Sequence, residues 1–210
     1  MENAAPQVRI LPTKFAGTGG AASYTDYKFA ALDKSVDDIL RIAYDVPPAR
    51  VIFAAAKPQG GYDYIANFAQ GSRQALQQEL KKQFGLIGRS ETRAMDSLLL
   101  RVRHPNAPGL KPATGGPGFL NDRVERGQNY VTCNNLSLSS IRNLLEQRLN
   151  QPVIDEIGLT QHFSFELTWN DLNGRNADHS SLKQALLDQL GLELVPTNMP
   201  VEMLLVEKAK

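Results

Sequence analysis

The sequence contains few of the residues on which disulfide, redox or metal chemistry depends. It has one cysteine, Cys133, in 210 residues, which excludes an internal disulfide, a CxxC redox motif and a cysteine-rich metal site. The histidines, His104, His162 and His179, lack the spacings of metal ligands. The nucleophile-elbow, zinc-protease and P-loop motifs are also absent from the sequence. We therefore expect no metal site and no cofactor.

Two further shortages narrow the class of protein. Lysine and arginine together number 23 and the acidic residues 22, a net charge of +1, so the basic excess of a generic nucleic-acid binder is missing and we expect no nucleic-acid partner. No apolar run approaches the roughly 18 residues of a membrane span, so we expect no direct membrane insertion. Residues 1–15 lack the pattern of a signal peptide. The alternatives are then a cytoplasmic protein or a domain excised from a longer exported chain.

What the sequence does contain is one pattern that occurs twice, in residues 27–103 and again in residues 130–208. Each copy opens with a strand-like stretch and continues with a serine and an amphipathic helix. Ser35 and Ser137 are placed to cap these helices by accepting a hydrogen bond from a first-turn N–H. The strands expected around these helices are 27–33, 51–55 and 62–68 in the first copy, and 130–136, 152–158 and 162–169 in the second.

The second helices of the two copies match best. Segments 74–86 and 181–192 carry leucine or phenylalanine at the same four-residue spacing. Gly85 and Gly191 fall where a helix ends in a left-handed residue, a conformation that glycine adopts without a steric penalty. Each copy is then expected to close with a hairpin-like pair of strands, which ends at 96–102 in the first copy and at 201–207 in the second.

These patterns predict an α+β protein with two tandem repeats of a β-α-β-β-α-β-β module, mixed sheets and four main helices. We expect residues 1–103 to hold an N-terminal strand and the first repeat, and residues 130–210 to hold the second. Between them, residues 104–129 are rich in glycine and proline. Because proline removes a backbone donor and glycine is costly to order, we expect this segment to be a linker without regular structure.

A few side chains are candidates for chemistry or binding. Cys133 lies in an expected strand, where a free cysteine is either a small buried hydrophobe or a nucleophile. Asp155 and His162 are close enough in sequence to form a catalytic pair in a groove, the alternative being an ordinary surface histidine. Trp169 ends a strand whose phenylalanines and leucine share its face. It is therefore either a core residue or an exposed platform for stacking a sugar or peptide.

The stretches 152–169 and 182–208 resemble the C-terminal signature of the soil-associated bacterial domain family of unknown function. The N-terminal half resembles that family more loosely. Members are generally exported, and some are fused to thioredoxin-like or metallopeptidase-sensor domains, so the resemblance implies an extracytoplasmic module (periplasm or cell envelope) excised from a longer exported chain. It supplies no catalytic residues. The matching positions are Val153, Asp155, Gly158, Leu159, Phe165, Leu167 and Trp169, and the departures are Ile157, Gln161, Phe163 and Ser164.

Three functions follow as hypotheses. The first is a non-enzymatic extracytoplasmic module that binds a protein or peptide partner in the cell envelope, by strand addition at a sheet edge. The second is a glycan or small-ligand sensor with a pocket between the repeats. Its expected ligand-binding residues are Trp169, Tyr62, Tyr64 and His162. The third is an enzyme that uses Cys133 or the Asp155–His162 pair, and it requires an exposed thiolate or imidazole in a cleft.

Overall fold

The computed structural model describes residues 4–17, 20–25, 27–105, 107, 109–158, 161–170 and 179–209. Its fold is α+β with mixed sheets, and the described residues include four α-helices, as the sequence predicts. The chain divides into two compact units. Unit 1 is Met1–Arg93 with Pro200–Lys210, and unit 2 is Ala94–Met199. Within the described residues no helix is both long enough and apolar enough to span a bilayer.

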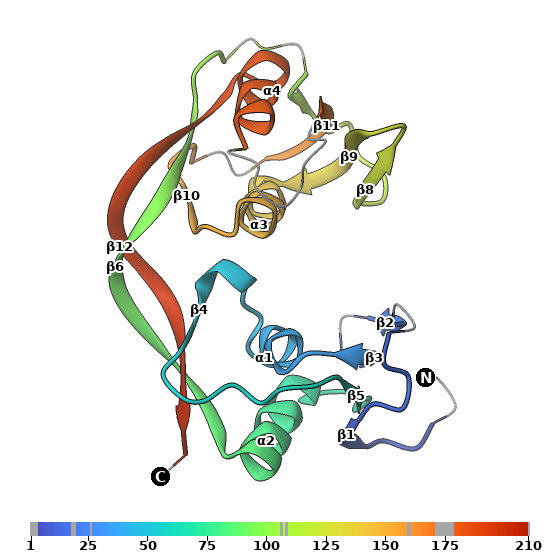
Figure 1. Ribbon diagram of the computed structural model, residues 1–210. Coiled ribbons are helices and arrows are strands. Elements are labelled where there is room, and N and C mark those ends of the chain that lie inside the picture. The colour runs from blue at the N-terminus through green and yellow to red at the C-terminus, as the bar shows by residue number, and fades with distance from the viewer. Residues whose placement is uncertain are drawn as a thin grey trace. The chain divides into compact units, whose positions relative to one another are not determined.

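Unit 1 is built on an antiparallel sheet with the strand order β1-β5-β3-β2. Helices α1 and α2 pack against each other and against this sheet (Figure 1). In chain order, its elements are β1 (Val8–Pro12), β2 (Ala22–Tyr24), β3 (Phe29–Lys34), α1 (Val36–Tyr44), the 3-10 helix η1 (Pro48–Arg50), β4 (Val51–Phe53), β5 (Tyr62–Ala66), α2 (Ser72–Phe84) and the first part of β6 (Leu86–Val102), joined by the last part of β12 (Leu192–Lys208).

Unit 2 is built on a second antiparallel sheet with the order β7-β11-β9-β8. Helix α3 contacts β9 and β10, and α4 contacts β11 (Figure 1). Its elements are the last part of β6, then β7 (Lys111–Pro112), β8 (Phe119–Glu125), β9 (Gln128–Ser137), α3 (Leu138–Leu149), β10 (Val153–Asp155), β11 (His162–Asn170), α4 (Ser180–Leu190) and the first part of β12.

The helix ends agree with the local signals in the sequence. Ser35 caps α1 in a capping box, in which its Oγ accepts a hydrogen bond from the Asp38 N–H at 3.2 Å and the Asp38 carboxylate accepts one from the Ser35 N–H. Ser137 also stands at the N-cap position, of α3, but its side chain makes no capping hydrogen bond. Gly85 and Gly191 end α2 and α4 with φ of 62° and 67°, which confirms the predicted left-handed residues.

The segment 104–129, expected to be a linker without regular structure, contains the strands β7 and β8. A two-residue turn at Arg126 and Gly127, with φ of 51° and 81°, folds β8 back onto β9. Positive φ at both central residues is the geometry that suits a β-hairpin. All seven residues of β8 are exposed. Because neither face of this strand is buried, its sequence carries no alternation of apolar and polar residues, and the sequence pattern did not reveal it.

The expected hairpin-like strand pairs at the ends of the two copies were wrong. In their place, β6 and β12 are single strands of 17 residues each. The stretch before residues 201–207 contains Pro196 and Pro200. However, β12 continues through both prolines, and the fixed φ of proline is compatible with extended backbone where its missing N–H is not needed.

The long strands also divide the chain differently from the expected domain boundaries. Each long strand contributes residues to both units. The boundary between the units falls after Arg93 in β6 and after Met199 in β12. The long strands are the central strands of the third sheet, whose order is β10-β6-β12-β4. Its two outer pairs are parallel, and Val51 of β4 lies opposite Leu204 of β12, while Val153 of β10 lies opposite Leu98 of β6. The end of each long strand therefore pairs with a strand from the other half of the sequence.

This exchange of strands completes both hydrophobic cores. In unit 1, Leu204 and Val206 of β12 belong to the same buried cluster as residues of α1, α2, β3 and β5. In unit 2, Leu98 and Leu100 of β6 belong to the cluster formed by α3, α4, β9 and β11. Val206 and Leu100 are both 0% exposed. Each unit thus depends on apolar side chains that lie far away in the sequence.

Candidate functional site

Cys133 is a core residue of unit 2. It lies on β9 with 2% of its surface exposed, and its Sγ donates a hydrogen bond to the Phe163 carbonyl at 3.7 Å. Burial raises the pKa of the Cys133 thiol above its usual value, since the charged thiolate is poorly solvated in an apolar core. An exposed thiolate, which the enzyme hypothesis requires at this position, is therefore not supported.

We expect Cys133 to react with iodoacetamide at pH 8 at least about 100-fold more slowly in the native protein than in denaturant, because alkylation needs an exposed thiolate and hence local opening. The measurement is the time course of the mass shift by intact-protein mass spectrometry. The unfolded chain in the same buffer provides the reference rate. Native labelling as fast as that reference would mean that the thiol is accessible and would return Cys133 to the candidate nucleophiles.

The structure does not bring Asp155 and His162 together as a hydrogen-bonded pair. The Asp155 Oδ1 accepts a hydrogen bond from the backbone N–H of Ile157 at 2.9 Å. The His162 Nδ1 lies 3.0 Å from the Oδ1 of Asn135, at the exposed start of β11. Each side chain thus has its own local partner, and the geometry favours a surface histidine.

Trp169 is buried, with 6% of its surface exposed, in the core of unit 2. The guanidinium of Arg148 lies 5.8 Å from the centre of its ring, within the range of a cation–π contact. An exposed stacking platform at Trp169 is therefore not what the structure shows, and the core interpretation is confirmed.

The two candidate tyrosines lie in unit 1, whereas Trp169 and His162 lie in unit 2. Tyr62 packs edge to face on Phe84 at 5.0 Å and donates its hydroxyl hydrogen to the Gln59 carbonyl. Tyr64 is 4% exposed, and its hydroxyl lies 3.3 Å from that of Tyr24. Burial in particular raises the pKa of Tyr64 far above its usual value. The expected ligand-binding set is therefore not gathered around one cavity within either unit.

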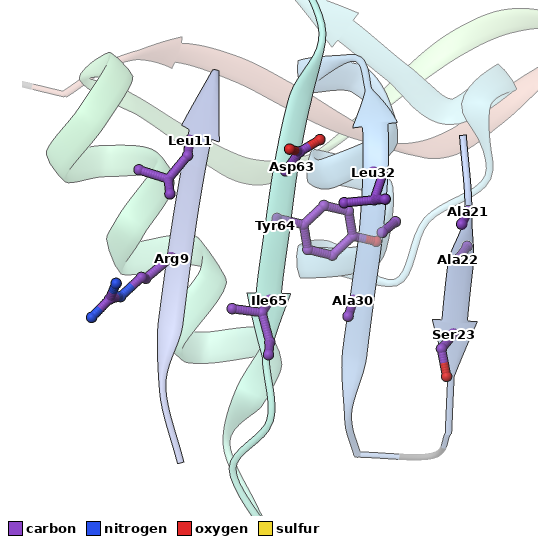
Figure 2. Close-up of a pocket in the computed structure, with 11 residues that line it drawn as sticks. Arg9, Leu11, Ala21, Ala22, Ser23, Ala30, Leu32, Asp63, Tyr64 and Ile65 are labelled. Atoms are coloured by element: carbon purple, nitrogen blue, oxygen red, sulfur yellow. The ribbon is translucent and has the colours of Figure 1, made fainter. Parts of the chain in front are cut away.

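A cavity of about 440 Å³ does occur, but within unit 1. It lies on the side of the β1-β5-β3-β2 sheet remote from α1 and α2 (Figure 2). Tyr64 is one of its lining residues and Tyr62 is not.

The outer edge of β8 in unit 2 is open, since β8 is the last strand of its sheet and all its residues are exposed. In a hairpin with a two-residue turn, the residues on either side of the turn form a hydrogen-bonded pair, and here these are Glu125 and Gln128. Along β8, every second residue from Glu125 then forms backbone hydrogen bonds with β9, and the residues between them do not. The backbone N–H and C=O groups of Leu120, Asp122 and Val124 then point away from β9. No described residue buries them, since every residue of β8 is exposed.

On the opposite side of each antiparallel sheet, a glutamine side chain from the neighbouring helix forms hydrogen bonds with backbone groups of a strand. In unit 2, the Gln189 side chain of α4 accepts from the Thr168 N–H at 3.0 Å and donates to the Thr168 carbonyl at 2.7 Å. In unit 1, Gln83 of α2 donates to the Ile10 carbonyl of β1 at 2.6 Å. Gln83 and Gln189 each stand two residues before the terminal glycine of their helix. These two edges are partly satisfied internally, unlike the outer edge of the seven-residue strand β8.

Sequence reasoning missed the β8 edge because it assigned residues 119–125 to a linker. A usable signal was present, since the Arg126-Gly127 turn separates two stretches with strand-forming residues. A two-residue turn ending in glycine between such stretches is a recognised hairpin pattern.

Comparison with known families shows which family the chain resembles. A family model described as "Protein of unknown function (DUF3738)" covers residues 37–209. The chain belongs to this family. The match begins inside α1, so the DUF3738 region contains β8 and both long strands, while β1, β2 and β3 precede it. No curated protein and no solved structure matches the chain.

Proposed function

We propose that this protein is a non-enzymatic extracytoplasmic module that binds a protein or peptide partner in the cell envelope by adding a partner strand to β8. The observation that supports the proposal is the open edge of β8, where the backbone groups of Leu120, Asp122 and Val124 point outward from a strand with every residue exposed. Unpaired backbone groups in a row are a template for a further strand. The extracytoplasmic location rests on the family resemblance.

The side chains beside the edge indicate the chemistry of the partner. Leu120 and Val124 lie on the face of the sheet that α3 covers, and they are 36% and 66% exposed. Asp122, between them, forms an ion pair with Arg148 of α3, so its charge is already compensated. We infer a partner strand with apolar residues at alternate positions, which would cover Leu120 and Val124.

We further propose that the two halves are tandem repeats of one module. Three features support this proposal: the two antiparallel sheets have matching strand orders, the glutamines on α2 and α4 have matching roles, and the exchanged strands have matching registers. Leu98 and Leu204 stand at the same distance beyond Gly85 and Gly191, and they pair with the first residues of β10 and β4.

The experiment that tests the proposed binding uses Val124→Pro. The Val124 N–H points away from β9, so proline removes an outward donor and places its ring at the free edge without breaking the hairpin. We expect the variant to bind an envelope partner at least about 10-fold more weakly than the natural protein, because both a hydrogen bond and close strand contact are lost. The partner is captured from an envelope extract on the immobilised protein, displaced by free protein and quantified by mass spectrometry.

Val124→Thr is the matched control, because it stays β-branched and keeps the N–H. It should retain binding. If the displaceable partner binds Val124→Pro as well as it binds the natural protein, strand addition at β8 is ruled out.

A second candidate function, small-ligand sensing, is favoured by the cavity in unit 1. A volume of about 440 Å³ falls in the range of small-molecule sites. The sequence led us to expect a sensor pocket between the repeats. This cavity lies instead inside unit 1.

A further inference from the structure

The outer face of the unit 1 sheet breaks the usual pattern of an antiparallel sheet. One face of such a sheet normally packs on the core and the other carries polar residues. In unit 1, the helix side buries Ile10 and Phe29. The outward positions of the three longest strands are nevertheless mostly apolar. They are Arg9 and Leu11 on β1, Asp63 and Ile65 on β5, and Ala30 and Leu32 on β3.

Two rows of side chains cross this face in register. The first row runs through Arg9, Ile65, Ala30 and Ser23, which lie directly opposite one another on β1, β5, β3 and β2. The second row includes Leu11 opposite Asp63, and Leu32, whose N–H donates to the Ala21 carbonyl at 2.8 Å. Figure 2 shows these side chains on the side of the sheet turned away from the helices.

The hollow follows from the sizes of these side chains. Alanine and serine on β2 and β3 leave space beside the larger leucine and isoleucine side chains, and the resulting cavity has a volume of about 440 Å³. Such a volume with an apolar lining suits a compact apolar group. An apolar face left to water would be unfavourable, so a bound apolar group would be stabilised there.

The lining contains two charged residues, Asp63 and Arg9, and they differ in how many partners they have within the protein. Burial acts to raise the pKa of Asp63, but hydrogen bonds from the Thr13 hydroxyl and from the backbone N–H groups of Asp33 and Lys14 outweigh it and lower that pKa. The Asp33 N–H lies 3.0 Å from the Asp63 Oδ1. The Asp63 carboxylate is therefore already held by the protein, and it disfavours a second anion nearby.

Arg9 is the cation of the lining and lies at the β1 margin, where Figure 2 shows its exposed side chain extending from the strand. It makes no ion pair with any other residue in the described part of the chain. An arginine guanidinium matches a carboxylate in geometry and charge. The complementary ligand is apolar where it meets Ile65, Ala30 and Leu32, and anionic where it meets Arg9.

We propose that this face of unit 1 binds a small amphipathic carboxylic acid, with its acyl chain over Ala30, Leu32 and Ile65 and its carboxylate at Arg9. The site is distinct from the β8 edge and lies in the other unit. Its success or failure therefore leaves the proposed binding of a protein partner untouched.

The test is isothermal titration of the whole chain with decanoate, decanol and decylamine, with decanol below its solubility limit and the two charged probes below their critical micelle concentrations. These probes share one chain length and differ in charge. We expect decanoate to bind one molecule per chain and to bind more tightly than the other two. Arg9→Gln should weaken decanoate binding about five-fold, the size of a partly exposed ion pair. Lys82→Gln removes the same charge from the helix side of unit 1 and should leave binding unchanged.

Ala30→Trp fills the hollow from an outward-facing position and should weaken binding at least about 10-fold. Unchanged hydrogen-exchange protection of α1 and α2 shows that this variant is folded. Leu32→Gln, which replaces an apolar lining side chain by an amide of similar length, provides a second variant with the same expected direction. The proposal is overturned if decanoate does not bind, if decanol or decylamine binds equally well, or if folded Ala30→Trp and Leu32→Gln bind decanoate as the natural protein does.

Discussion

Replacing Val206 by aspartate is expected to unfold unit 1, although Val206 lies in the last strand of the chain. Val206 is 0% exposed and belongs to the core cluster that contains α1 and α2. Its carbonyl also accepts a hydrogen bond from the Ala54 N–H at 2.8 Å. A carboxylate at this position would be buried without a partner, which costs at least about 4 kcal/mol of unfolding free energy.

Leu100→Asp is the matched variant for unit 2. Leu100 follows Gly85 at the same spacing as Val206 follows Gly191. Its carbonyl accepts a hydrogen bond from the Glu156 N–H, just as the Val206 carbonyl accepts one from the Ala54 N–H. Leu100 is also 0% exposed, in the core cluster of α3 and α4. We expect Leu100→Asp to unfold unit 2, although this residue lies in the first half of the sequence.

Hydrogen exchange measured peptide by peptide separates the two results. Val206→Asp should lose protection first in α1 and α2, and Leu100→Asp first in α3 and α4. The single tryptophan, Trp169, is buried in unit 2 and reports on that unit alone by its fluorescence. The opposite assignment, with Val206→Asp opening α3 and α4 first, would be incompatible with the exchange of strands.

Local features of this fold could be predicted from the sequence because their causes are local. The capping box at Ser35 and the left-handed glycines at Gly85 and Gly191 depend on backbone groups within one turn. The alternation along β11 depends on side chains within one strand, and Phe163, Phe165, Leu167 and Trp169 are buried on one face as predicted.

The exchange of strands could not be predicted in this way. The apolar run Leu98–Leu100 in β6 closely resembles the run Leu204–Val206 in β12. Either run could therefore complete either core as far as hydrophobicity is concerned, and the choice is made by tertiary packing. The 17-residue length of each strand carries its end away from its own half and into the core of the other.

The candidate sites were harder to predict, for a related reason. Aromatic residues drew attention to Trp169 and Tyr64, but both are buried, because large apolar rings stabilise a core most. The open features use residues with weak sequence signals. The β8 edge presents backbone groups, which every sequence has, and the hollow in unit 1 arises from small side chains such as Ala30. Neither can be recognised without the strand order.

Glu146→Leu is expected to destabilise unit 2 by about 2 kcal/mol, the size of a hydrogen bond between a backbone N–H and a buried carboxylate. Glu146 lies on α3 and is 0% exposed, and its Oε1 accepts a hydrogen bond from the Val153 N–H at 2.9 Å. Val153 is the residue of β10 that lies opposite Leu98 of the exchanged strand. The Glu146 carboxylate therefore fixes the position at which β10 meets β6.

Leucine fills most of the volume of the glutamate side chain but cannot accept a hydrogen bond, whereas glutamine keeps an acceptor oxygen in the same place. Glu146→Gln should accordingly lose less than about 1 kcal/mol, so that the difference between the two variants isolates the hydrogen bond from the packing. The free energy of unfolding is measured by urea titration with Trp169 fluorescence, which follows unit 2. Equal losses in the two variants would assign the effect to the buried carboxylate charge and not to the bond that it makes with β10.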